Sequence, residues 1–333
     1  MIILRSSALN FKNLHDIKIN WSPGINLILG SNGAGKTNLL ESLNIMAGWG
    51  SFTKISELIT WNSNLNYSYL SAKISGEADE DLNINAKISG KIILRLDQKF
   101  ITSTNMRFLI PSLCFLPGNI NLIDGSPSVR RLFIDKLCAL FYPAYAKRLA
   151  EFKLISRNRS ALLKQNKSPN ITNIPFCKLG GWIMQARRDL ILNLKNNNLV
   201  TEITPNINNN INCAEYLYNE LKKFYSQEIS TGRILTGPNF DDLIINFNGR
   251  SAEFLSRGQK RILILNLIIS AADLIILRLK RKPVLFFDDL TAELDKNAKS
   301  KTYEKLLNTG LQIFITASEN PFNIKNPEGY TFK

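Results

Sequence analysis

The stretch Gly30-Ser-Asn-Gly-Ala-Gly-Lys-Thr37 matches the spacing G-x-x-x-x-G-K-[ST] at every position. The apolar residues 25–29 before it predict a buried strand, and residues 38–43 after it open a helix with apolar residues on one face. This order predicts a phosphate-binding loop, because backbone N–H groups and the helix dipole both favour an anion there. A glycine-rich turn that matches by chance is the alternative, and the flanking strand and helix argue against it.

Each residue type in the loop has an expected role toward ATP and Mg²⁺. Lys36 is expected to act catalytically by reaching the β- and γ-phosphates, and the Thr37 hydroxyl is expected to ligate Mg²⁺. The residues expected to bind the nucleotide here are Gly30, Ser31, Asn32, Gly33, Ala34, Gly35, Lys36 and Thr37.

A second half-site lies near the other end of the chain. Val284-Leu-Phe-Phe-Asp-Asp289 has four apolar residues followed by two carboxylates, which is the pattern of a Walker B strand. Such a strand predicts Asp288 beside the phosphate loop, where it can hold Mg²⁺ directly or through water. Asp289 stands where a general base for an attacking water would be, and its side chain is shorter than the usual Glu, so slow turnover is expected. The alternative is a strand that ends in two solvated aspartates.

Two further motifs flank this strand. Leu255-Ser-Arg-Gly-Gln259 precedes a long apolar helix, and Thr291-Ala-Glu-Leu-Asp295 follows the strand. Alone, Ser-x-Gly-Gln is a weak signal that is more often a helix cap. The order of phosphate loop, insert, signature, Walker B strand and D-loop, however, resembles the ABC-type ATPases, including the SMC-like group. The resemblance implies that Ser256, Gly258 and Gln259 of one subunit bind the nucleotide of the other, in an ATP-dependent homodimer.

Motifs spread over nearly the whole chain are similar to those of the RecF family within that group. They are Asn10-Phe-Lys-Asn13, Gly125-Ser-Pro-Ser-Val-Arg-Arg131, Thr236-Gly-Pro-Asn-Phe-Asp-Asp-Leu243, Ser256-Arg-Gly-Gln-Lys-Arg261 and Asp288-Asp-Leu-Thr-Ala-Glu-Leu-Asp295. The resemblance implies an ATP-dependent DNA-binding protein of recombinational repair and replication. Its implied partners are double-stranded and gapped DNA, RecR, with RecO as a further candidate, and the RecA filament that it helps to load at single-strand gaps.

The expected fold is α/β, an ABC-type (P-loop) ATPase head with an inserted helical second lobe. The ATP-binding lobe is expected to be discontinuous, comprising residues 1–125 and 230–333 and including a small antiparallel β region between 66 and 96. Residues 126–229 are expected to form the helical lobe. The whole insert between Lys36 and Ser256 contains no sustained heptads, so a long coiled coil is excluded. Within that lobe we expect helices over 129–165, 178–197 and 214–227, and loops over 165–173 and 195–212.

Composition narrows the class of partner. A formal net charge of +15 predicts a polyanionic binding partner, with nucleic acid favoured over an anionic membrane surface. A general bias toward Lys and Asn in the composition is an alternative explanation of the charge. Four separated cysteines and the lack of a secretory signal predict a reducing cytoplasm. The apolar run 262–277 is shorter than a membrane span, so we expect a core helix and no membrane partner.

Departures from the family pattern leave the enzymatic activity open. Pro117-Gly-Asn119 lacks the acid that the family usually has there, and Ala317 stands where ABC transporters have a switch histidine. We expect a weak, DNA-stimulated ATPase, with DNA binding as the main role. A non-hydrolysing ATP- and DNA-binding scaffold is the alternative. An ABC transporter ATPase subunit is less favoured, because of Ala317, the basic charge and the helical insert.

Overall fold

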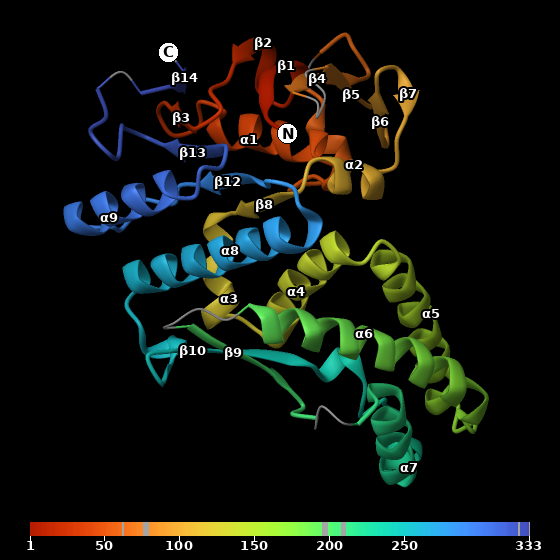
Figure 1. Ribbon diagram of the computed structural model, residues 1–333. Helices are drawn as coiled ribbons and strands as arrows, with labels where there is room; N and C mark the ends of the chain where they lie inside the picture. Colours follow the sequence, from red (N-terminus) through yellow and green to blue (C-terminus); the bar gives the residue numbers. More distant parts are fainter. Residues whose placement is uncertain (62, 76–79, 195–198, 208–210, 326, 333) are drawn as a thin grey trace. The chain divides into compact units, whose positions relative to one another are not determined.

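The computed structural model describes residues 1–61, 63–75, 80–194, 199–207, 211–325 and 327–332 (Figure 1). The chain forms two compact units: unit 1 comprises Met1–Asn119 and Arg257–Lys333, and unit 2 comprises Ile120–Ser256. Unit 2 therefore extends beyond position 229, because the strands near its end pair with a strand inside it. The expected lobe boundaries at 125/126 and 229/230 remain a prediction about domains.

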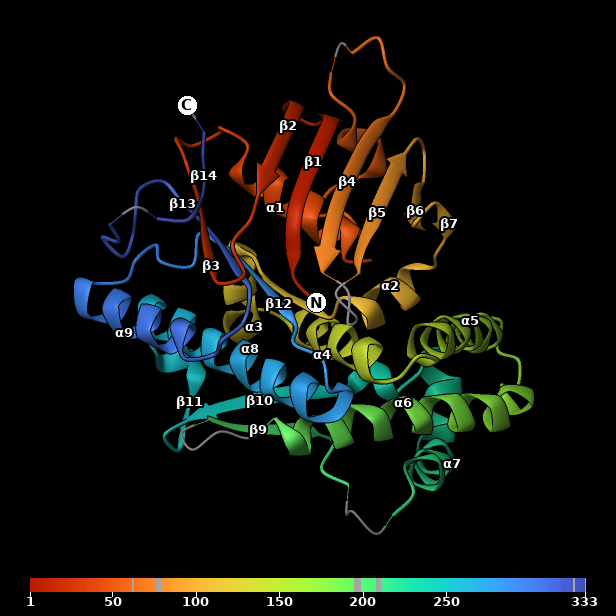
Figure 2. The same ribbon diagram turned by 45° about the horizontal axis from the view of Figure 1, so that its top comes forward.

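Unit 1 is built on two sheets with helix α1 (Lys36–Met46) between them (Figure 2). One sheet is antiparallel in the order β2-β1-β4-β5-β6-β7, so the antiparallel region expected between 66 and 96 is confirmed. Its strands are Ile3–Phe11 (β1), Leu14–Asn20 (β2), Ser68–Ser75 (β4), Asp81–Ile88 (β5), Ile92–Leu96 (β6) and Lys99–Phe100 (β7).

The other sheet of unit 1 is parallel, in the order β14-β3-β13-β12-β8. Its strands are Ile25–Leu29 (β3), Ser112–Phe115 (β8), Val284–Asp288 (β12), Ile313–Ala317 (β13) and Gly329–Thr331 (β14). Every residue of β12 and β13 is buried, which explains their uninterrupted apolar sequence.

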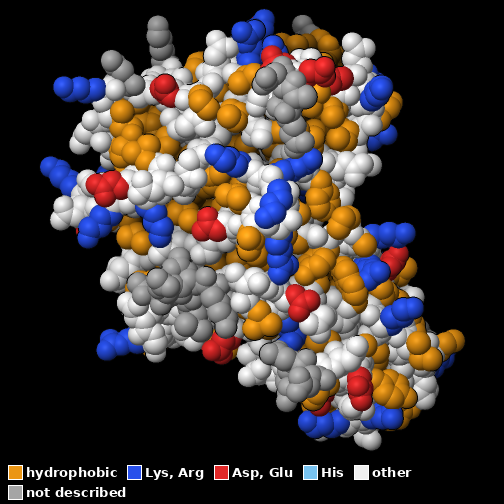
Figure 3. All heavy atoms as spheres, viewed as in Figure 1, with side chains coloured by type: hydrophobic (Ala, Val, Ile, Leu, Met, Phe, Trp, Pro, Cys, Tyr) orange, Lys and Arg blue, Asp and Glu red, His pale blue; other side chains and the backbone are white. Residues whose placement is uncertain are grey.

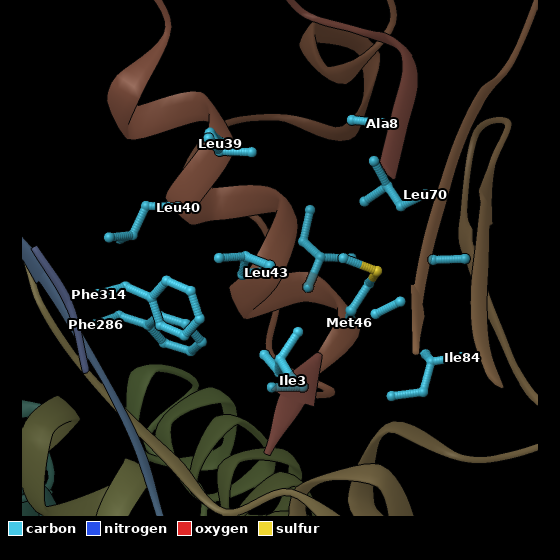
Figure 4. Close-up of a cluster of buried hydrophobic side chains, with 14 of the residues drawn as sticks. Ile3, Ala8, Leu39, Leu40, Leu43, Met46, Leu70, Ile84, Phe286 and Phe314 are labelled. Carbon is cyan, nitrogen blue, oxygen red and sulfur yellow. The ribbon is translucent and has the colours of Figure 1, made fainter. Parts of the chain in front are cut away.

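The core of unit 1 lies on both sides of α1 (Figure 4). Leu40 and Leu43 face Phe286 and Phe314 of the parallel sheet, and Met46 lies on the side of the antiparallel sheet. All residues of α1 from 39 to 46 are buried, because both of its faces are covered. This packing holds the helix start, and with it the preceding loop, at one edge of the parallel sheet.

The remaining helical elements of unit 1 are Ile55–Leu58 (η1), Ser103–Leu109 (α2), Arg257–Leu279 (α8) and Lys296–Leu307 (α9), and the turn Pro117–Ile120 (η2) lies at the boundary between the units. Helix α8 is long and apolar enough to span a membrane by length and composition, and 61% of its most apolar window is buried in the protein. It packs against β8, so within this unit it is a core helix.

Unit 2 combines helices with a small antiparallel sheet in the order β11-β10-β9. Its helical elements are Asn121–Asp124 (α3), Pro127–Phe141 (α4), Tyr145–Lys164 (α5), Asn170–Thr172 (η3), Asn173–Asn193 (α6), Cys213–Thr231 (α7), Pro238–Phe240 (η4) and Ala252–Phe254 (η5). Its strands are Leu199–Thr204 (β9), Asp242–Phe247 (β10) and Arg250–Ser251 (β11).

The prediction of loops over 195–212 is wrong in part. Residues 199–204 form β9, which pairs antiparallel with β10 from Thr204↔Asp242 to Leu199↔Phe247. The surrounding asparagines suggested a loop, but the run Leu-Val-Thr-Glu-Ile-Thr is rich in β-branched residues and gains a partner strand that is distant in the sequence. Positions 195–198 and 208–210 of that prediction lie outside the described residues.

Candidate nucleotide-binding site

The candidate site lies at the carboxyl ends of three neighbouring parallel strands. Strand β13 lies between β3 and β12, with Thr316 paired to Ile28 on one side and to Asp288 on the other. The loop from Gly30 follows β3 directly. The two half-sites from the ends of the chain therefore meet at one sheet edge, where open α/β sheets bind their ligands.

The phosphate loop has the backbone that its glycines permit. Gly33 and Gly35 have φ angles of +82° and +112°, in the region that favours glycine. A Cβ on Gly35 would lie 2.8 Å from the side-chain oxygen of Asn13, so this position also needs glycine for space. The Lys36 ammonium donates to the carbonyl oxygens of Gly30 at 2.7 Å and Ser31 at 2.8 Å, so the loop curves around this cation.

A hydroxyl–carboxylate cluster lies beside the loop. Thr37 Oγ1 lies 3.0 Å from both carboxylate oxygens of Asp288, and the Thr316 hydroxyl donates to Asp288 Oδ1 at 2.6 Å. Asp288 is only 6% exposed, whereas Thr37 is exposed. Hydroxyl and carboxylate oxygens are the ligands that Mg²⁺ prefers, so Thr37 and Asp288 fit a magnesium–nucleotide at this edge.

Asp289 turns away from the strand. Its φ angle is +53°, and its N–H donates to Thr316 Oγ1 at 2.9 Å, so one threonine orients both aspartates. Asp289 remains accessible to solvent at the site, although neighbouring residues cover part of it. The pKa of Asp289 is raised above 3.8, mainly because partial burial removes hydration from the carboxylate; Asp288 and Glu293 raise it further, while Arg261 and Lys36 oppose the shift.

The signature segment is joined to the Walker B end through Arg261 and Glu293. Arg261, on α8, donates from Nη1 to the Asp289 carbonyl oxygen at 2.7 Å, and its Nε lies 3.6 Å from Glu293. Arg257 lies 3.5 Å from the same carboxylate, and a Cβ on Gly258 would lie 3.2 Å from the Glu293 carbonyl oxygen. The start of α8 and the D-loop therefore form one connected structure.

The segment between β1 and β2 supports the loop from the other side. The Asn13 amide donates to the Gly33 carbonyl oxygen at 3.1 Å and accepts from Asn38 at 2.8 Å. Lys12 pairs at 2.5 Å with Glu41, whose side chain is fully buried. Asn13 is thus a functional candidate that sequence reasoning placed in a motif without assigning it a role.

The predicted site residues are placed as follows. Lys36, Thr37, Asp288 and Asp289 come together at one sheet edge of unit 1. The signature residues lie where the two units join in sequence: Ser256 is the last residue of unit 2, and Gly258 and Gln259 lie in the first turn of α8. Thr316 and Arg261 had no predicted role. Thr316 directly precedes Ala317, the position compared above with the switch histidine of ABC transporters, and this was the one available signal for it.

The fold and this site define an ABC-type ATPase head. The sequence profile of the RecF/RecN/SMC N-terminal domain matches residues 3–328, and the chain belongs to this family, in its RecF branch.

Relatives and solved structures agree. The DNA replication and repair protein RecF of Streptococcus suis is 27% identical to this chain, over 96% of this chain and 93% of its own length. The protein of the same name from Carboxydothermus hydrogenoformans is 29% identical, over 98% of this chain and 96% of its own length. A structure of the recombination mediator protein RecF-ATPrS in the RecFOR pathway has a TM-score of 0.82 at 26% identity, covering 96% of this chain and 92% of its own. An Smc head bound to the C-winged helix domain of ScpA, with a TM-score of 0.55 at 19% identity over 97% of this chain and 91% of its own, shares the fold.

Proposed function

We propose that this chain is an ATP-binding and DNA-binding protein of recombinational repair and replication, acting in the cytoplasm as an ATP-gated homodimer. The observation that carries the proposal is the meeting of Lys36, Thr37 and Asp288 at one sheet edge, in a chain whose end-to-end relatives are named DNA replication and repair proteins. The formal net charge of +15 supports a nucleic acid as the polyanion that it binds.

The residues of the site have different proposed roles toward the nucleotide. Lys36 and the backbone N–H groups of residues 30–37 bind the phosphates, and Thr37 and Asp288 hold Mg²⁺. When bound, Mg²⁺ neutralises the charge that develops on the phosphate oxygens. Asp289 accepts a proton from the attacking water at a carboxylate oxygen. Its raised pKa makes it a better base than an ordinary Asp, while its short side chain limits its reach, so we expect slow hydrolysis.

We propose a dimer because the phosphate loop and the signature residues of one chain would serve two different nucleotides. Ser256, Gly258 and Gln259 of one subunit would contact the γ-phosphate held by Lys36 of the other, so that closure depends on ATP. Arg261 supports this role, because it links the signature helix to the Asp289 carbonyl and thus couples the two half-sites. Closure on double-stranded or gapped DNA and release after hydrolysis would then be the working cycle.

The proposed partners follow from the family. A similar solved structure is described as part of the RecFOR pathway, so we propose RecR as a partner, RecO as a further candidate, and assistance to RecA loading at single-strand gaps. Backbone phosphates would be the main DNA contacts, which predicts binding that is sensitive to salt and largely indifferent to sequence.

The test is phosphate release by the purified protein with and without gapped duplex DNA. We expect slow release that DNA stimulates and that Lys36→Ala abolishes, because the variant loses the cation that binds the phosphates. Lys99→Ala, an exposed lysine on β7, is the matched control and should behave as the unchanged protein. DNA binding that is the same with and without ATP, in both the unchanged protein and Lys36→Ala, would contradict the proposal.

A non-hydrolysing ATP- and DNA-binding scaffold is the second candidate. The short Asp289 side chain at the general-base position favours it, because Glu is the more usual base there. It predicts ATP-dependent DNA binding with phosphate release no greater than that of Lys36→Ala. Measuring binding and release on the same preparation separates the two candidates.

A further inference from the structure

Unit 2 contains a groove of about 820 Å³ between α5 and residues 232–240, which we call the α5 groove. Four cationic side chains line it, and no acidic side chain is among its described lining residues: Lys153, Arg157, Lys164 and Arg233. All four are exposed, and none has an ion-pair partner within the described parts of the chain. The groove is therefore strongly positive, because no acidic side chain among the described residues neutralises its four cations.

The fold holds both walls of this groove in place. Gly232 ends α7 with a φ angle of +65°, and a Cβ on it would lie 3.7 Å from the Leu163 carbonyl oxygen, near the end of α5. Glu228 of α7 accepts from the Leu235 N–H at 2.9 Å and pairs with Arg159 of α5 at 2.5 Å, with both charged side chains fully buried. Arg233 is thus carried next to α5 by a fixed backbone.

Three of the cations on α5 form one stripe. Because residues of an α-helix are about 100° apart, Lys153, Arg157 and Lys164 lie within about 40° of one another, along roughly 16 Å of the helix. The helix contains six cationic side chains and one acidic side chain, Glu151, which lies on the opposite side from Lys153. Figure 3 shows Lys and Arg side chains along the side of unit 2 where Figure 1 places α5.

Two further side chains indicate what the groove binds. Ser156 lines the groove and is 8% exposed, and its hydroxyl has no hydrogen-bond partner among the described residues. A buried hydroxyl without a partner is costly unless a ligand supplies one. Phe240, on the opposite wall, is 50% exposed, so an aromatic face is available beside the cations.

We propose that the α5 groove binds single-stranded DNA, with phosphates along Lys153, Arg157 and Lys164, a hydrogen bond from the Ser156 hydroxyl to the strand, and a base stacked on Phe240. A cationic track with an exposed aromatic ring is the combination that binds a single strand without sequence preference. Duplex DNA would leave Phe240 without a base to stack on, because its bases are already stacked on one another. The inference rests on the proposed DNA-binding function and assigns the single-stranded side of a gap to unit 2.

The experiment measures binding of a fluorescent oligodeoxythymidine of about 15 nucleotides by anisotropy over a range of salt concentrations. Arg157→Gln with Lys164→Gln should weaken binding and reduce the slope of log affinity against log salt by about 1.4, because two phosphate contacts are lost. Lys147→Gln with Lys178→Gln removes the same charge from unit 2 outside the groove and should leave the slope unchanged. Equal slopes for the two double variants would overturn the proposal.

Two single variants test the specific contacts. Phe240→Ala should weaken binding of the single strand about tenfold and leave binding of a blunt duplex unchanged, since only the single strand offers a base to the ring. Ser156→Ala should weaken binding of the single strand while the melting temperature stays equal or rises, because it removes a hydroxyl without a partner. Full binding by both variants, or equal loss on single strand and duplex, would overturn the assignment of a single-strand groove.

The same preparations keep this inference separate from the proposed function. If Lys36→Ala loses ATP-dependent duplex binding while the groove variants bind the single strand normally, the groove assignment alone fails. If duplex binding is independent of ATP and of Lys36, the proposed function fails, and the groove is then judged by its own salt slopes.

Discussion

The Arg159–Glu228 pair of unit 2 and Lys36 of unit 1 use charge in different ways. In unit 2, Arg159 and Glu228 are both fully buried and pair at 2.5 Å, and Arg159 also donates to Thr172 at 3.0 Å. In unit 1, Lys36 is half-buried and donates only to carbonyl oxygens of its own loop among the hydrogen bonds of the described residues. The buried ion pair stabilises the fold, because each charge has its counter-ion inside the protein. Within the described parts of the chain Lys36 donates only to carbonyl oxygens, so its charge is available to an anionic ligand.

The largest effect on stability is expected from breaking the buried pair of unit 2. Glu228→Ala should lower the free energy of unfolding by about 3–5 kcal/mol, because it leaves the buried Arg159 without its counter-ion. Urea unfolding measures this. Glu151→Ala, on the exposed side of α5, is the control and should change stability by no more than about 0.5 kcal/mol. A Glu228→Ala protein as stable as this control would remove the contrast between the buried pair and Lys36.

In unit 1, loss of the Thr316 hydroxyl should affect catalysis. Thr316→Val removes the hydroxyl that donates to Asp288 and accepts from the Asp289 N–H. We expect ATP hydrolysis to fall about 10- to 100-fold with little change in ATP affinity, since Thr316 positions the aspartates and Lys36 still binds phosphate. Thr302→Val, at a buried threonine of α9, is the control. An equal loss of rate in both variants would mean that the change acts through packing.

A smaller effect concerns pH. The Asp289 carboxylate accepts a proton only when ionised, and its pKa is raised, so the hydrolysis rate should fall as pH decreases and begin to fall at a higher pH than an ordinary Asp would require. A pH–rate profile measures this. Asp289→Asn should remove the acid limb together with most of the rate, and Asp289→Glu should increase the rate. If the unchanged protein and Asp289→Asn have the same pH–rate profile, Asp289 is not the base.

Local patterns predicted much of unit 1. The strand at 25–29, the glycine loop and the strand ending at Asp288 were all expected, because each is a short segment whose chemistry is contained in adjacent residues. The longer helices of unit 2 were also expected, but the range 129–165 contains two separate helices, α4 and α5, and α6 spans Asn173–Asn193 and not 178–197. In contrast, β9 was assigned to a loop, since its conformation depends on pairing with β10, which follows much later in the chain.

The supporting residues of the site were not predictable in the same way. Thr316 touches Asp288 because β13 lies between β3 and β12, and strand order is a property of the whole sheet. Arg261 reaches the Asp289 carbonyl because α8 packs within the same unit. Neither contact is encoded in residues next to the motifs.

The residues proposed to bind the nucleotide follow from the sequence alone: a lysine and a threonine after a glycine loop, and two aspartates after an apolar strand. These features depend on backbone geometry over a few residues, so spacing alone specifies them. Tertiary structure decided which groups orient those residues, through Thr316, Arg261 and Asn13, and it created the α5 groove. The physical reason is that hydrogen bonds and charge clusters between distant segments exist only once strand order and helix packing have been established.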